Sequence, residues 1–489
     1  MQRVEFSSRH TLHSVESTRS IEVAAQAVLP PHTLMQRAGL AVAKLGLALA
    51  PHSRRIWVAC GPGNNGGDGI EAACHLKQRG KDVVVTWLGT PETAPADALT
   101  SYQAALAAGV EFAAAPPDHF DLCIDALLGI GSRRVPEGRM AQWIQLINTS
   151  NQAVLAVDLP TGLQADTGVR AELAVKAHET LSLLTLKPGL FTAHGRDLAG
   201  TVWLDDLGLN GRLLPGQQTL APRAWLGGAP VTVTRLHTSH KGSYGDVAVI
   251  GGAPGMAGAA LLAGSAALHA GAGRVYVGLL DQDIHGLAAH QPELMFRPVS
   301  NLNLRVMTVV CGCGGGEAVR EELARIVSTS ARLVMDADAL NHLASDSALQ
   351  LLLTARGKRH MPSVLTPHPL EAARLLQCTV GEVQADRLRA ANQLANHFAC
   401  CVVLKGSGSV ISFPNETPLI NPTGNPKLAT AGSGDVLAGM IGAGLATGLP
   451  PLQAACEATY RHGLAADQWH QTLSPLAASR LARSPQIRP

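Results

Sequence analysis

The sequence predicts an α/β protein of two domains, each built on a parallel sheet covered by helices. Short apolar segments recur along the chain, each ends in glycine or polar residues, and helix-like segments separate them. Apolar residues make up 46% of the 489 residues and aromatic residues only 3%, a composition that suits helices packed closely on parallel sheets. At roughly 150 residues per domain, a chain of this length needs two or three cores.

In the first half, residues 55–60 form an apolar run that ends in Gly61-Pro62-Gly63. The same pattern, a strand closed by turn residues, recurs at 82–87, 122–124 and 153–157, with helix-like segments at 69–79 and 100–108. This alternation predicts a doubly wound parallel sheet, whose ligands are expected at the carboxyl ends of the strands.

A region without periodicity follows, rich in Gly, Pro, Gln and Arg, and we expect a linker at residues 213–227. A new buried strand then enters a glycine turn at 246–252, and an Ala-rich helix is predicted at 256–270. Further strands are expected at 274–278, 306–310, 333–335 and 401–404. Because the two halves share no period, the prediction is two distinct domains, at 1–212 and 228–489, rather than a repeat.

Charge and cysteine usage exclude several classes of protein. The net charge is +2, which gives no electrostatic reason to expect a nucleic-acid or membrane partner. The nearest cysteine pairs, Cys311/Cys313 and Cys400/Cys401, are too close in sequence for the usual metal-binding spacing, so buried reduced thiols are expected. The N-terminus lacks an apolar signal core and no run reaches the ~20 apolar residues of a membrane span, which predicts a cytoplasmic protein.

The segment 431–439 carries the strongest local signal in the chain. Gly432, Ser433 and Gly434 precede Asp435, and an apolar Ala/Gly-rich run follows. This order predicts a bare loop that opens onto a helix N-terminus, where free N–H groups bind anions. Asp435 would then act as a base toward a substrate hydroxyl or water. The alternative is an ordinary helix start in which Asp435 is a capping residue.

Three segments of the first half are expected at one edge of the sheet. Residues 64–69 follow a predicted strand with two Asn and three Gly residues, while Asp125 and Asp158 each close a strand. Glycine amides suit a diphosphate, and carboxylate and amide oxygens suit a hard cation, with one carboxylate left as a base. A structural turn at 64–69 and turn or cap roles for both Asp residues are the alternatives. Arg133 and Arg134 are phosphate clamps or solvated loop residues.

The second half holds weaker candidates. His368 lies between two prolines, which restrict its backbone and favour a fixed orientation. Residues 405–409 leave a predicted strand and suit contact with a nucleotide, although a glycine-rich hairpin fits equally. The glycines of 312–316 permit close approach of a ligand, with a tight turn as the alternative.

Taken together, these motifs resemble one family, the bifunctional NAD(P)H-hydrate repair enzymes, in which an NAD(P)HX epimerase is fused to an ADP-dependent NAD(P)HX dehydratase. The resemblance covers nearly the whole chain. In the first half it rests on residues 34–39, 64–69, 125–131, 158–162 and 187–189. In the second half it rests on 240–245, 258–260, 271–273, 336–341, 366–369, 405–406 and 421–439. It implies a Rossmann-like three-layer domain followed by a ribokinase-like domain.

For the epimerase, the resemblance implies that Asp158 handles the proton at C6 and that Asn65, Asp125 and Thr161 hold K⁺. The residues implied in binding the hydrated nucleotide are Asn64, Asn65, Gly66, Gly67, Asp68, Gly129, Ile130, Gly131, Ser132, Arg133, Arg134, Val135 and Asp158.

For the dehydratase, the resemblance implies Asp435 as the catalytic aspartate, Mg²⁺ as the metal and ADP as a co-substrate that yields AMP and phosphate. The implied substrate positions are Ala259, Gly316, His368 and Asp435, and the implied ADP positions are Lys405, Gly406, Ser407, Gly408, Ser409 and Gly434. A homo-oligomer is expected by the same resemblance, and the residues leave open ADP against ATP and NADHX against NADPHX.

The chain departs from the family pattern at several positions. Leu370 stands where Gly is usual, 312–316 reads Gly-Cys-Gly-Gly-Gly in place of Gly-Pro-Gly-Leu-Gly, and Lys427 replaces Gly, which we expect to place a cation near the phosphates. Two other functions compete. A ribokinase-like kinase would share the anion loop and Asp435, and a non-enzymatic RNA-processing scaffold would leave Asp158 without a role.

Overall fold

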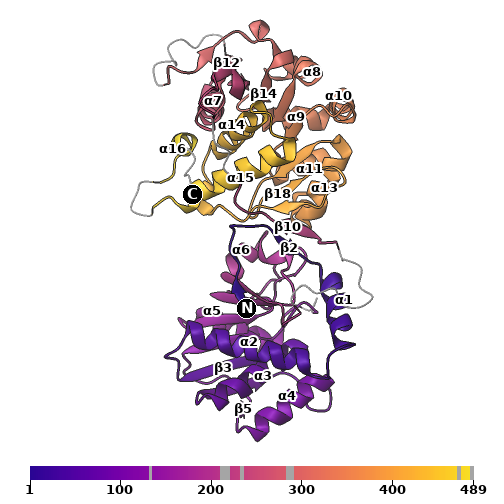
Figure 1. The fold of residues 1–489 in the computed structure, drawn as a ribbon, viewed down its shortest axis with the longest axis vertical. Helices are drawn as coiled ribbons and strands as arrows, with labels where there is room; N and C mark the ends of the chain where they lie inside the picture. The colour runs from indigo at the N-terminus through magenta and orange to yellow at the C-terminus, as the bar shows by residue number, and fades with distance from the viewer. Residues whose placement is uncertain (132–134, 210–220, 232–235, 282–290, 471–474, 485–489) are drawn as a thin grey trace. The chain divides into compact units, whose positions relative to one another are not determined.

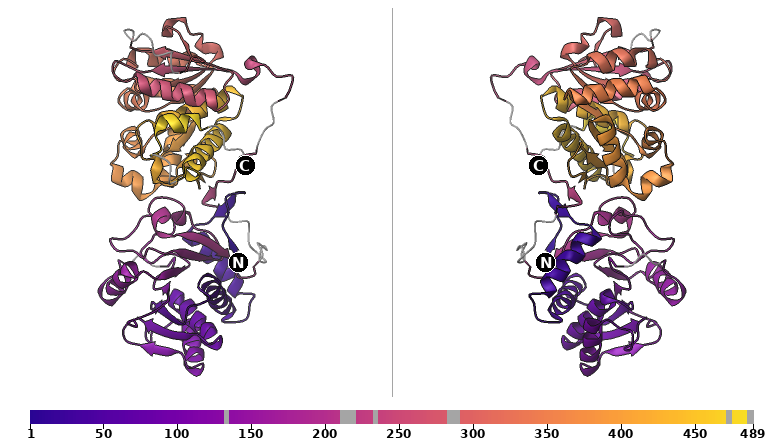
Figure 2. Two further views of the ribbon diagram at one scale, coloured as in Figure 1. Left: turned by 90° about the vertical axis from the view of Figure 1, so that its left-hand side faces the viewer. Right: turned by 90° about the vertical axis from the view of Figure 1, so that its right-hand side faces the viewer.

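The computed structural model describes residues 1–131, 135–209, 221–231, 236–281, 291–470 and 475–484 (Figure 1). The chain divides into two compact units. The first comprises Met1–Glu5 and His10–Ala224, and the second comprises Phe6–Arg9 and Trp225–Pro489. Each unit is α/β, which confirms the predicted fold class, and Figure 2 shows helices on both sides of the sheet in each unit.

The sheet of the first unit has the strand order β1-β9-β8-β7-β6-β3-β4-β5, and its pairs are parallel except β1 with β9. The strands are β1 (Gln2–Arg3), β3 (Arg55–Cys60), β4 (Asp82–Trp87), β5 (Glu111–Ala113), β6 (Leu122–Ala126), β7 (Ala153–Val157), β8 (Glu179–Leu183) and β9 (Thr201–Asp205), and the unit also contains β2 (His10–Leu12). The helices are α1 (Val15–Gln26), α2 (Thr33–Leu49), α3 (Asn64–Gln78), α4 (Ala96–Ala107), α5 (Gly138–Thr149) and α6 (Gly195–Leu198).

Strand β3 explains why this sheet is buried on both faces. Ile56 and Val58 point to one side, into a core shared with α2 and α3, while Trp57 points to the other side and packs with Trp143 of α5. A strand covered on both faces is apolar along its whole length, which is why residues 55–60 read as a continuous apolar run. The order reverses at β3, because the chain runs outward to β4 and β5 and then returns to place β6 on the other side. Such a switch point is where open α/β sheets bind ligands.

The sheet of the second unit runs β13-β12-β11-β14-β15-β16-β17-β18-β19-β10, parallel from β13 to β17, with β18 antiparallel to both neighbours. The strands are β10 (Ala224–Leu226), β11 (Asp246–Gly251), β12 (Arg274–Leu279), β13 (Met295–Phe296), β14 (Thr308–Cys311), β15 (Arg332–Met335), β16 (Ser363–Leu365), β17 (Cys401–Leu404), β18 (Val410–Ser412) and β19 (Leu419–Ile420). The helices are α7 (Ala257–His269), α8 (Arg320–Thr329), α9 (Asp338–Ser345), α10 (Ser347–Lys358), α11 (Pro369–Leu376), α12 (Val380–Ala385), α13 (Arg387–Phe398), α14 (Ser433–Ala446), α15 (Pro451–Asp467) and α16 (Ala478–Arg483).

Small residues let the helices of this second unit approach one another and the sheet. Helices α7, α14 and α15 supply many Ala residues to the core over one face, where they meet Val247, Val310 and Val403 of the strands. At Gly439 of α14, an added Cβ would lie 2.1 Å from the carbonyl oxygen of Ala263 of α7. The order of this sheet reverses between β11 and β14, so the ends of these two strands form its switch point.

The structure differs from the sequence prediction at α3. Residues 64–69 were expected as a loop before a helix at 69–79, but α3 begins at Asn64 and takes in the whole segment. Asn and Gly favour turns over helix interiors, so local propensity argued against this start. Packing decides it instead. A Cβ on Gly66 would lie 2.0 Å from the Gly61 carbonyl oxygen, so only glycine fits there.

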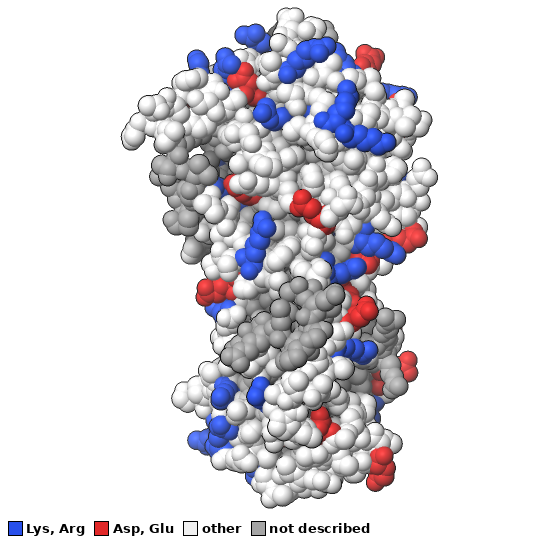
Figure 3. Space-filling view, turned by 45° about the vertical axis from the view of Figure 1, so that its right-hand side comes forward, with Lys and Arg blue, Asp and Glu red and all other residues white. Residues whose placement is uncertain are grey.

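The division between Ala224 and Trp225 falls inside the segment 213–227 that was expected as a linker. Residues 213–220 of that segment lie outside the described residues, and its end contains the strand β10. None of the helices that the structure describes is long and apolar enough to cross a membrane. On the face drawn in Figure 3, basic and acidic side chains are scattered among uncharged ones.

Candidate functional sites

The first site is a cavity of about 720 Å³ at the switch point of the first sheet. It is bounded by α1, by the start of α3, and by loops at the carboxyl ends of β3, β6, β7 and β8. Charged and amide side chains converge on it, namely Arg19, Glu22, Gln26, Asn64, Asn65, Asp68, Asp97, Asp158 and Lys187. The backbone of Gly129, Ile130 and Gly131 completes one wall. The free N–H groups of the first turn of α3 favour an anion at this end of the cavity.

Asp158 is held firmly at the wall of this cavity. It is only 7% exposed and has a φ of +67°, which non-glycine residues rarely adopt. The fully buried ammonium group of Lys187 forms an ion pair with Asp158 Oδ1, and the backbone N–H of Leu183 donates to the same oxygen at 3.2 Å. Lys187 also donates to the Leu183 carbonyl at 2.7 Å. One carboxylate oxygen is therefore fixed by protein contacts, while the side chain lines the cavity.

Asp125 lies behind this wall, fully buried at the end of β6. Its carboxylate accepts hydrogen bonds from the hydroxyl and backbone N–H of Thr161, at 2.7 and 2.8 Å, and from Leu127 N–H at 3.2 Å. Burial raises the pKa of Asp125 to about 6, although these hydrogen bonds oppose the shift. Among the described residues no cation pairs with it. Asn65 Nδ2 is also buried without a hydrogen-bond partner.

Asp68 and Glu22 face the same cavity from α3 and α1. Burial raises the pKa of Asp68 well above its ordinary value, and the nearby carboxylates of Asp158 and Glu22 add to the shift. Burial raises the pKa of Glu22 as well, again with a contribution from Asp158. Like charges that share a desolvated site favour the protonated form. Two carboxyl groups with raised pKa values therefore face the same cavity as Asp158.

The predicted residues of this first site fall into three groups. Asn64, Asn65, Asp68, Gly129, Ile130, Gly131 and Asp158 line the cavity. Gly66 and Gly67 do not line it, because their missing side chains make room for Gly61 and Met35 rather than for a ligand. Val135 is 54% exposed and lies outside the lining, while Ser132, Arg133 and Arg134 lie outside the described residues.

The second site lies at the N-terminus of α14, where the predicted helix start is present. Gly432 precedes the helix with a φ of +88°, and an added Cβ would lie 2.5 Å from Leu262, so glycine is required. Asp435 sits in the first turn and is half-buried. Burial raises its pKa to about 7, and the negative charge of Asp336 adds to the shift. A carboxylate with this pKa suits general-base work near neutral pH.

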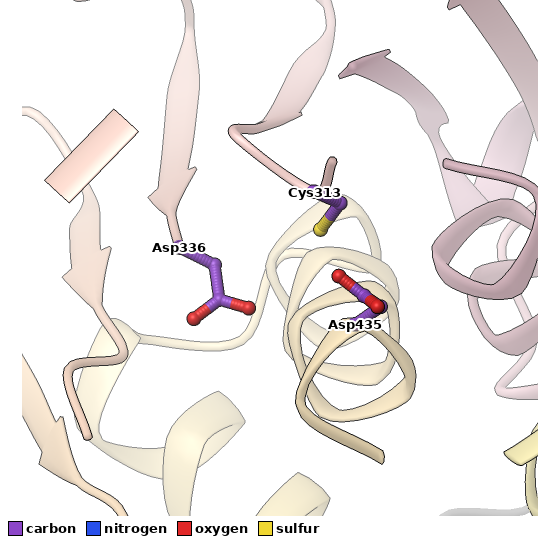
Figure 4. A group of neighbouring side chains, drawn as sticks. All are labelled: Cys313, Asp336 and Asp435. Atoms are coloured by element: carbon purple, nitrogen blue, oxygen red, sulfur yellow. The ribbon is translucent and has the colours of Figure 1, made fainter. Parts of the chain in front are cut away.

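Asp435 belongs to a cluster drawn in Figure 4, with Asp336 directly after β15 and Cys313 in the turn after β14. One ligand atom of each lies within 4.8 Å of the others. Lys405, after β17, donates to Asp336 Oδ1 at 2.6 Å. Its Nζ lies 3.3 Å from where a Cβ on Gly434 would stand, so the ammonium group is beside the start of α14. Lys405 thus adds a positive charge to the anion-binding helix end.

His368 is fixed by the helix that it starts. It precedes α11 and its Nδ1 accepts from the N–H groups of Leu370 and Glu371, at 3.1 and 3.3 Å. The ring proton therefore lies on Nε2, which meets Glu371 Oε1 at 3.1 Å. Glu371 Oε2 in turn accepts from the His368 N–H at 2.8 Å and lies 4.0 Å from Lys405 Nζ. Burial raises the pKa of Glu371 to about 7.

The glycine turn 312–316 brings the remaining substrate positions near this cluster. Gly314 has a φ of +58°, and an added Cβ would lie 2.9 Å from the Cβ of Ala259. The N–H of Gly316 donates to Asp338 at 2.8 Å.

The segment 405–409, expected to contact ADP, packs against the buried side chain of Arg387. A Cβ on Gly406 would lie 3.0 Å from the guanidinium group of Arg387, and Arg387 donates to the Lys405 carbonyl at 3.1 Å. The arginine side chain therefore fixes the backbone at the start of this segment, at Lys405 and Gly406.

Two departures from the family pattern have structural outcomes. Lys427 Nζ donates to the Trp469 carbonyl at 2.7 Å, and its closeness to a bound phosphate stays a prediction. Leu370 is 44% exposed and leaves the cap between His368 and Glu371 intact.

Sequence reasoning missed four residues of these sites as site residues: Lys187, Asp336, Glu371 and Cys313. Asp336 closes a strand as Asp125 and Asp158 do, so the same rule applies to it. No sequence pattern marks Lys187 or Glu371 as a site residue, because each approaches its partner, Asp158 or Lys405, only in the folded structure.

Comparison with known proteins gives a consistent picture. The family model described as NAD(P)H-hydrate dehydratase matches residues 247–486, and the one described as YjeF-related protein N-terminus matches residues 31–189. The bifunctional NAD(P)H-hydrate repair enzyme Nnr of Escherichia coli (strain K12) is 37% identical over 96% of this chain and 91% of its own length. An ADP-dependent (S)-NAD(P)H-hydrate dehydratase of Neisseria meningitidis serogroup B is 45% identical over 48% of this chain and 80% of its own.

Among solved structures, an ADP/ATP-dependent NAD(P)H-hydrate dehydratase from Bacillus subtilis matches with 32% identity and a TM-score of 0.44. The match covers 51% of this chain and 90% of that one.

Proposed function

The chain belongs to the bifunctional NAD(P)H-hydrate repair enzymes, and from that premise we propose which of the two reactions each site catalyses. The first unit interconverts the R and S epimers of NADHX and NADPHX, and the second dehydrates the S epimer to NAD(P)H with conversion of ADP to AMP and phosphate. The observation that carries this proposal is that each unit has a buried or half-buried aspartate near the carboxyl ends of its strands. Asp158 directly follows β7 and lines the first cavity, and Asp435, in the first turn of α14, lies beside the residues that follow β14 and β15.

In the first unit we assign proton exchange at C6 to Asp158. The hydroxyl group on C6 leaves and returns on the opposite face of the ring, and each passage requires a proton to be given and taken back. Lys187 holds one oxygen of Asp158, so the carboxylate keeps one orientation toward the cavity while the substrate changes configuration. The nicotinamide nucleotide would place its phosphates at the N-terminus of α3.

We propose that K⁺ binds near Asn65, Asp125 and Thr161. The side chains of these residues offer hard oxygens, and Asp125 is a fully buried carboxylate with no cation paired to it among the described residues. The ion would neutralise this carboxylate and hold the adjoining loops in place. Thr161 orients Asp125 through its hydroxyl and its N–H.

In the second unit we assign Asp435 as the base. It takes the proton of the C6 hydroxyl as that oxygen attacks the β-phosphorus of ADP, and the bond from phosphorus to the bridging oxygen breaks to release AMP. The amides at Gly432 to Gly434 and the Lys405 ammonium face the charge that grows on the phosphoryl group. The C6–O bond then breaks with electron push from the ring nitrogen, phosphate leaves, and loss of a C5 proton restores NAD(P)H.

Ala259, Gly316 and His368 would contact the hydrated nucleotide, and residues 405–409 with Gly434 would contact ADP. Mg²⁺ would neutralise the phosphates of ADP, and we assign no side chain of this protein to it. We also propose a homo-oligomer, on the family resemblance alone, and light scattering of the purified protein tests it. A cytoplasmic location is proposed from the sequence, on the scattered cysteines and the lack of an apolar signal core.

The test follows every product of the second reaction. Purified protein is incubated with S-NADHX, ADP and Mg²⁺, and NADH, AMP and phosphate are measured together. Equal amounts of all three are expected. A stable phosphorylated product without NADH would instead indicate a kinase. Loss of epimerisation in Asp158→Ala is expected as well, and unchanged epimerisation in that variant would reject Asp158 as the proton carrier.

A further inference from the structure

The cluster of Cys313, Asp336 and Asp435 has the composition of a metal site as well as a catalytic one. The three side chains come from separate elements and point toward one another (Figure 4), and their ligand atoms lie within 4.8 Å of one another. Cys313 is fully buried and Asp336 is 1% exposed. Ligands that already converge in a buried place need little rearrangement to close on an ion.

The atoms available to an ion can be identified from the contacts. Lys405 and the hydroxyl of Thr366 both donate to Oδ1 of Asp336, at 2.6 and 2.7 Å. The other oxygen, Oδ2, faces the start of α14, since a Cβ on Gly434 would lie 3.7 Å from it. Among the residues that the structure describes, Lys405 is the cation bonded to this group of two carboxylates and a thiol. When both carboxylates are ionised, negative charge therefore exceeds positive charge in the cluster.

We propose that Cys313, Asp336 and Asp435 form a site for a thiophilic divalent cation of the Zn²⁺ class. Sulfur favours Zn²⁺, Cd²⁺ or Co²⁺ over Mg²⁺ and K⁺, which prefer all-oxygen sites. Sγ and one oxygen from each aspartate supply three ligands, and water fills the fourth position of a tetrahedral ion. Binding displaces the thiol proton to solvent, so the metal–sulfur bond forms as the S–H bond breaks.

Occupation of this site has a consequence for the reaction, which rests on the proposed function. Asp435 cannot accept the proton of the C6 hydroxyl while its oxygen is bound to the ion. Zn²⁺ bound in this site therefore inhibits the dehydratase.

Cobalt tests the site without any substrate. The full-length protein, stripped of metal by a chelator, is titrated with Co²⁺ alone and its near-ultraviolet absorption is recorded. A thiolate-to-cobalt charge-transfer band that saturates at one Co²⁺ per chain is expected. Cys313→Ser should abolish the band, and Cys378→Ser, which removes a more accessible thiol outside the cluster, should keep it. Absence of the band in the unmodified protein, or its survival in Cys313→Ser, would overturn the proposal.

Asp435→Asn provides a second variant that keeps the thiol and removes one carboxylate ligand. Its apparent affinity for Co²⁺ should fall at least about tenfold, and an unchanged affinity would remove Asp435 from the site. In the activity arm, Zn²⁺ should inhibit NADH formation from S-NADHX at least about tenfold more strongly in the unmodified protein than in Cys313→Ala. The cobalt band does not depend on the enzymatic reaction, so failure of the metal site and failure of the proposed function give different results.

Discussion

The two proposed catalytic aspartates lie in opposite electrostatic surroundings. Asp158 is paired with the buried ammonium of Lys187, whereas Asp435 is close to the negative charge of Asp336 and has a pKa raised to about 7. An ion pair fixes the position of a carboxylate, and a like charge raises its affinity for a proton. The first arrangement suits orientation of the group, and the second suits removal of a proton near neutral pH.

This difference predicts the pH dependence of the dehydratase. A base acts in its deprotonated form, so activity is lost as the pH falls through the pKa of the base. Because the pKa of Asp435 is raised to about 7, this loss should occur near pH 7 instead of near the ordinary pKa of a carboxyl group. The rate of NADH formation should be constant above about pH 8 and fall about tenfold per pH unit well below pH 7. Rates at saturating S-NADHX and ADP across this range measure the effect.

Glu371 provides the control for that profile, because its pKa is also raised to about 7 and it lies beside Lys405. Glu371→Gln should retain the inflection near pH 7, and Asp435→Asn should lower the rate at least about 100-fold at every pH. If the inflection disappears in Glu371→Gln, the titrating group is Glu371 and the assignment of the base is wrong.

Lys187→Met tests the ion pair of the first site. The variant leaves the buried carboxylate of Asp158 without its cation. Loss of one partner of a buried ion pair typically lowers the free energy of unfolding by about 3–5 kcal/mol. It also allows the carboxylate to rotate. Epimerisation should slow at least tenfold, by about 1.4 kcal/mol in the barrier, while dehydration of the S epimer is unchanged. NMR of the two epimers measures the first rate, circular dichroism checks folding, and an unaltered epimerisation rate would contradict a positioning role.

At the scale of elements, the second site depends on the close approach of α14 to α7. A Cβ on Gly439 would lie 2.1 Å from the Ala263 carbonyl oxygen, which is backbone and cannot yield easily. Gly439→Ala should therefore lower the free energy of unfolding by about 1–3 kcal/mol. Because α14 also carries Asp435, dehydration should slow in the folded variant. Urea denaturation and steady-state rates measure the two effects.

Gly258→Ala is the matched control for this substitution. Gly258 lies in α7, and a Cβ there would meet no atom within 4 Å. Alanine is the better helix former by about 1 kcal/mol, so the variant should be as stable as the unmodified protein or slightly more so. Equal destabilisation by both substitutions would show that helix packing at Gly439 is not the cause.

Strands were the most predictable elements. Residues 55–60, 82–87, 153–157 and 401–404 agree with β3, β4, β7 and β17, because a strand buried on both faces is an uninterrupted apolar run. Helices were predicted less evenly, since the helix expected at 256–270 agrees with α7, whereas α3 and α4 begin several residues before the expected starts at 69 and 100. The start of α3 at Asn64 depends on glycines that fit against Gly61 and Met35, and no local propensity reports such contacts.

The candidate sites were predictable only in part, for the same physical reason. Asp158 and Asp435 stand at strand and helix ends, where sequence pattern and sheet topology together predict ligand binding. The partners that set their chemistry come from distant segments. Lys187 reaches Asp158 from beyond β8, and Cys313 and Asp336 approach Asp435 from two other strand ends.

For the whole molecule, the central claim is two activities in one chain. The core clusters described for the first sheet and those for the second contain no residue in common, and each sheet has its own switch point. Loss of one aspartate should therefore remove one activity and spare the other.

Recovery of reduced-nicotinamide absorbance from a mixture of R- and S-NADHX, with ADP, Mg²⁺ and K⁺, tests this claim most directly. The unmodified protein should convert both epimers completely. Asp158→Ala should stop once the S epimer is exhausted, except for the slow spontaneous epimerisation, and Asp435→Ala should give no recovery. Complete recovery by Asp435→Ala, or absence of recovery by the unmodified protein, would contradict the account.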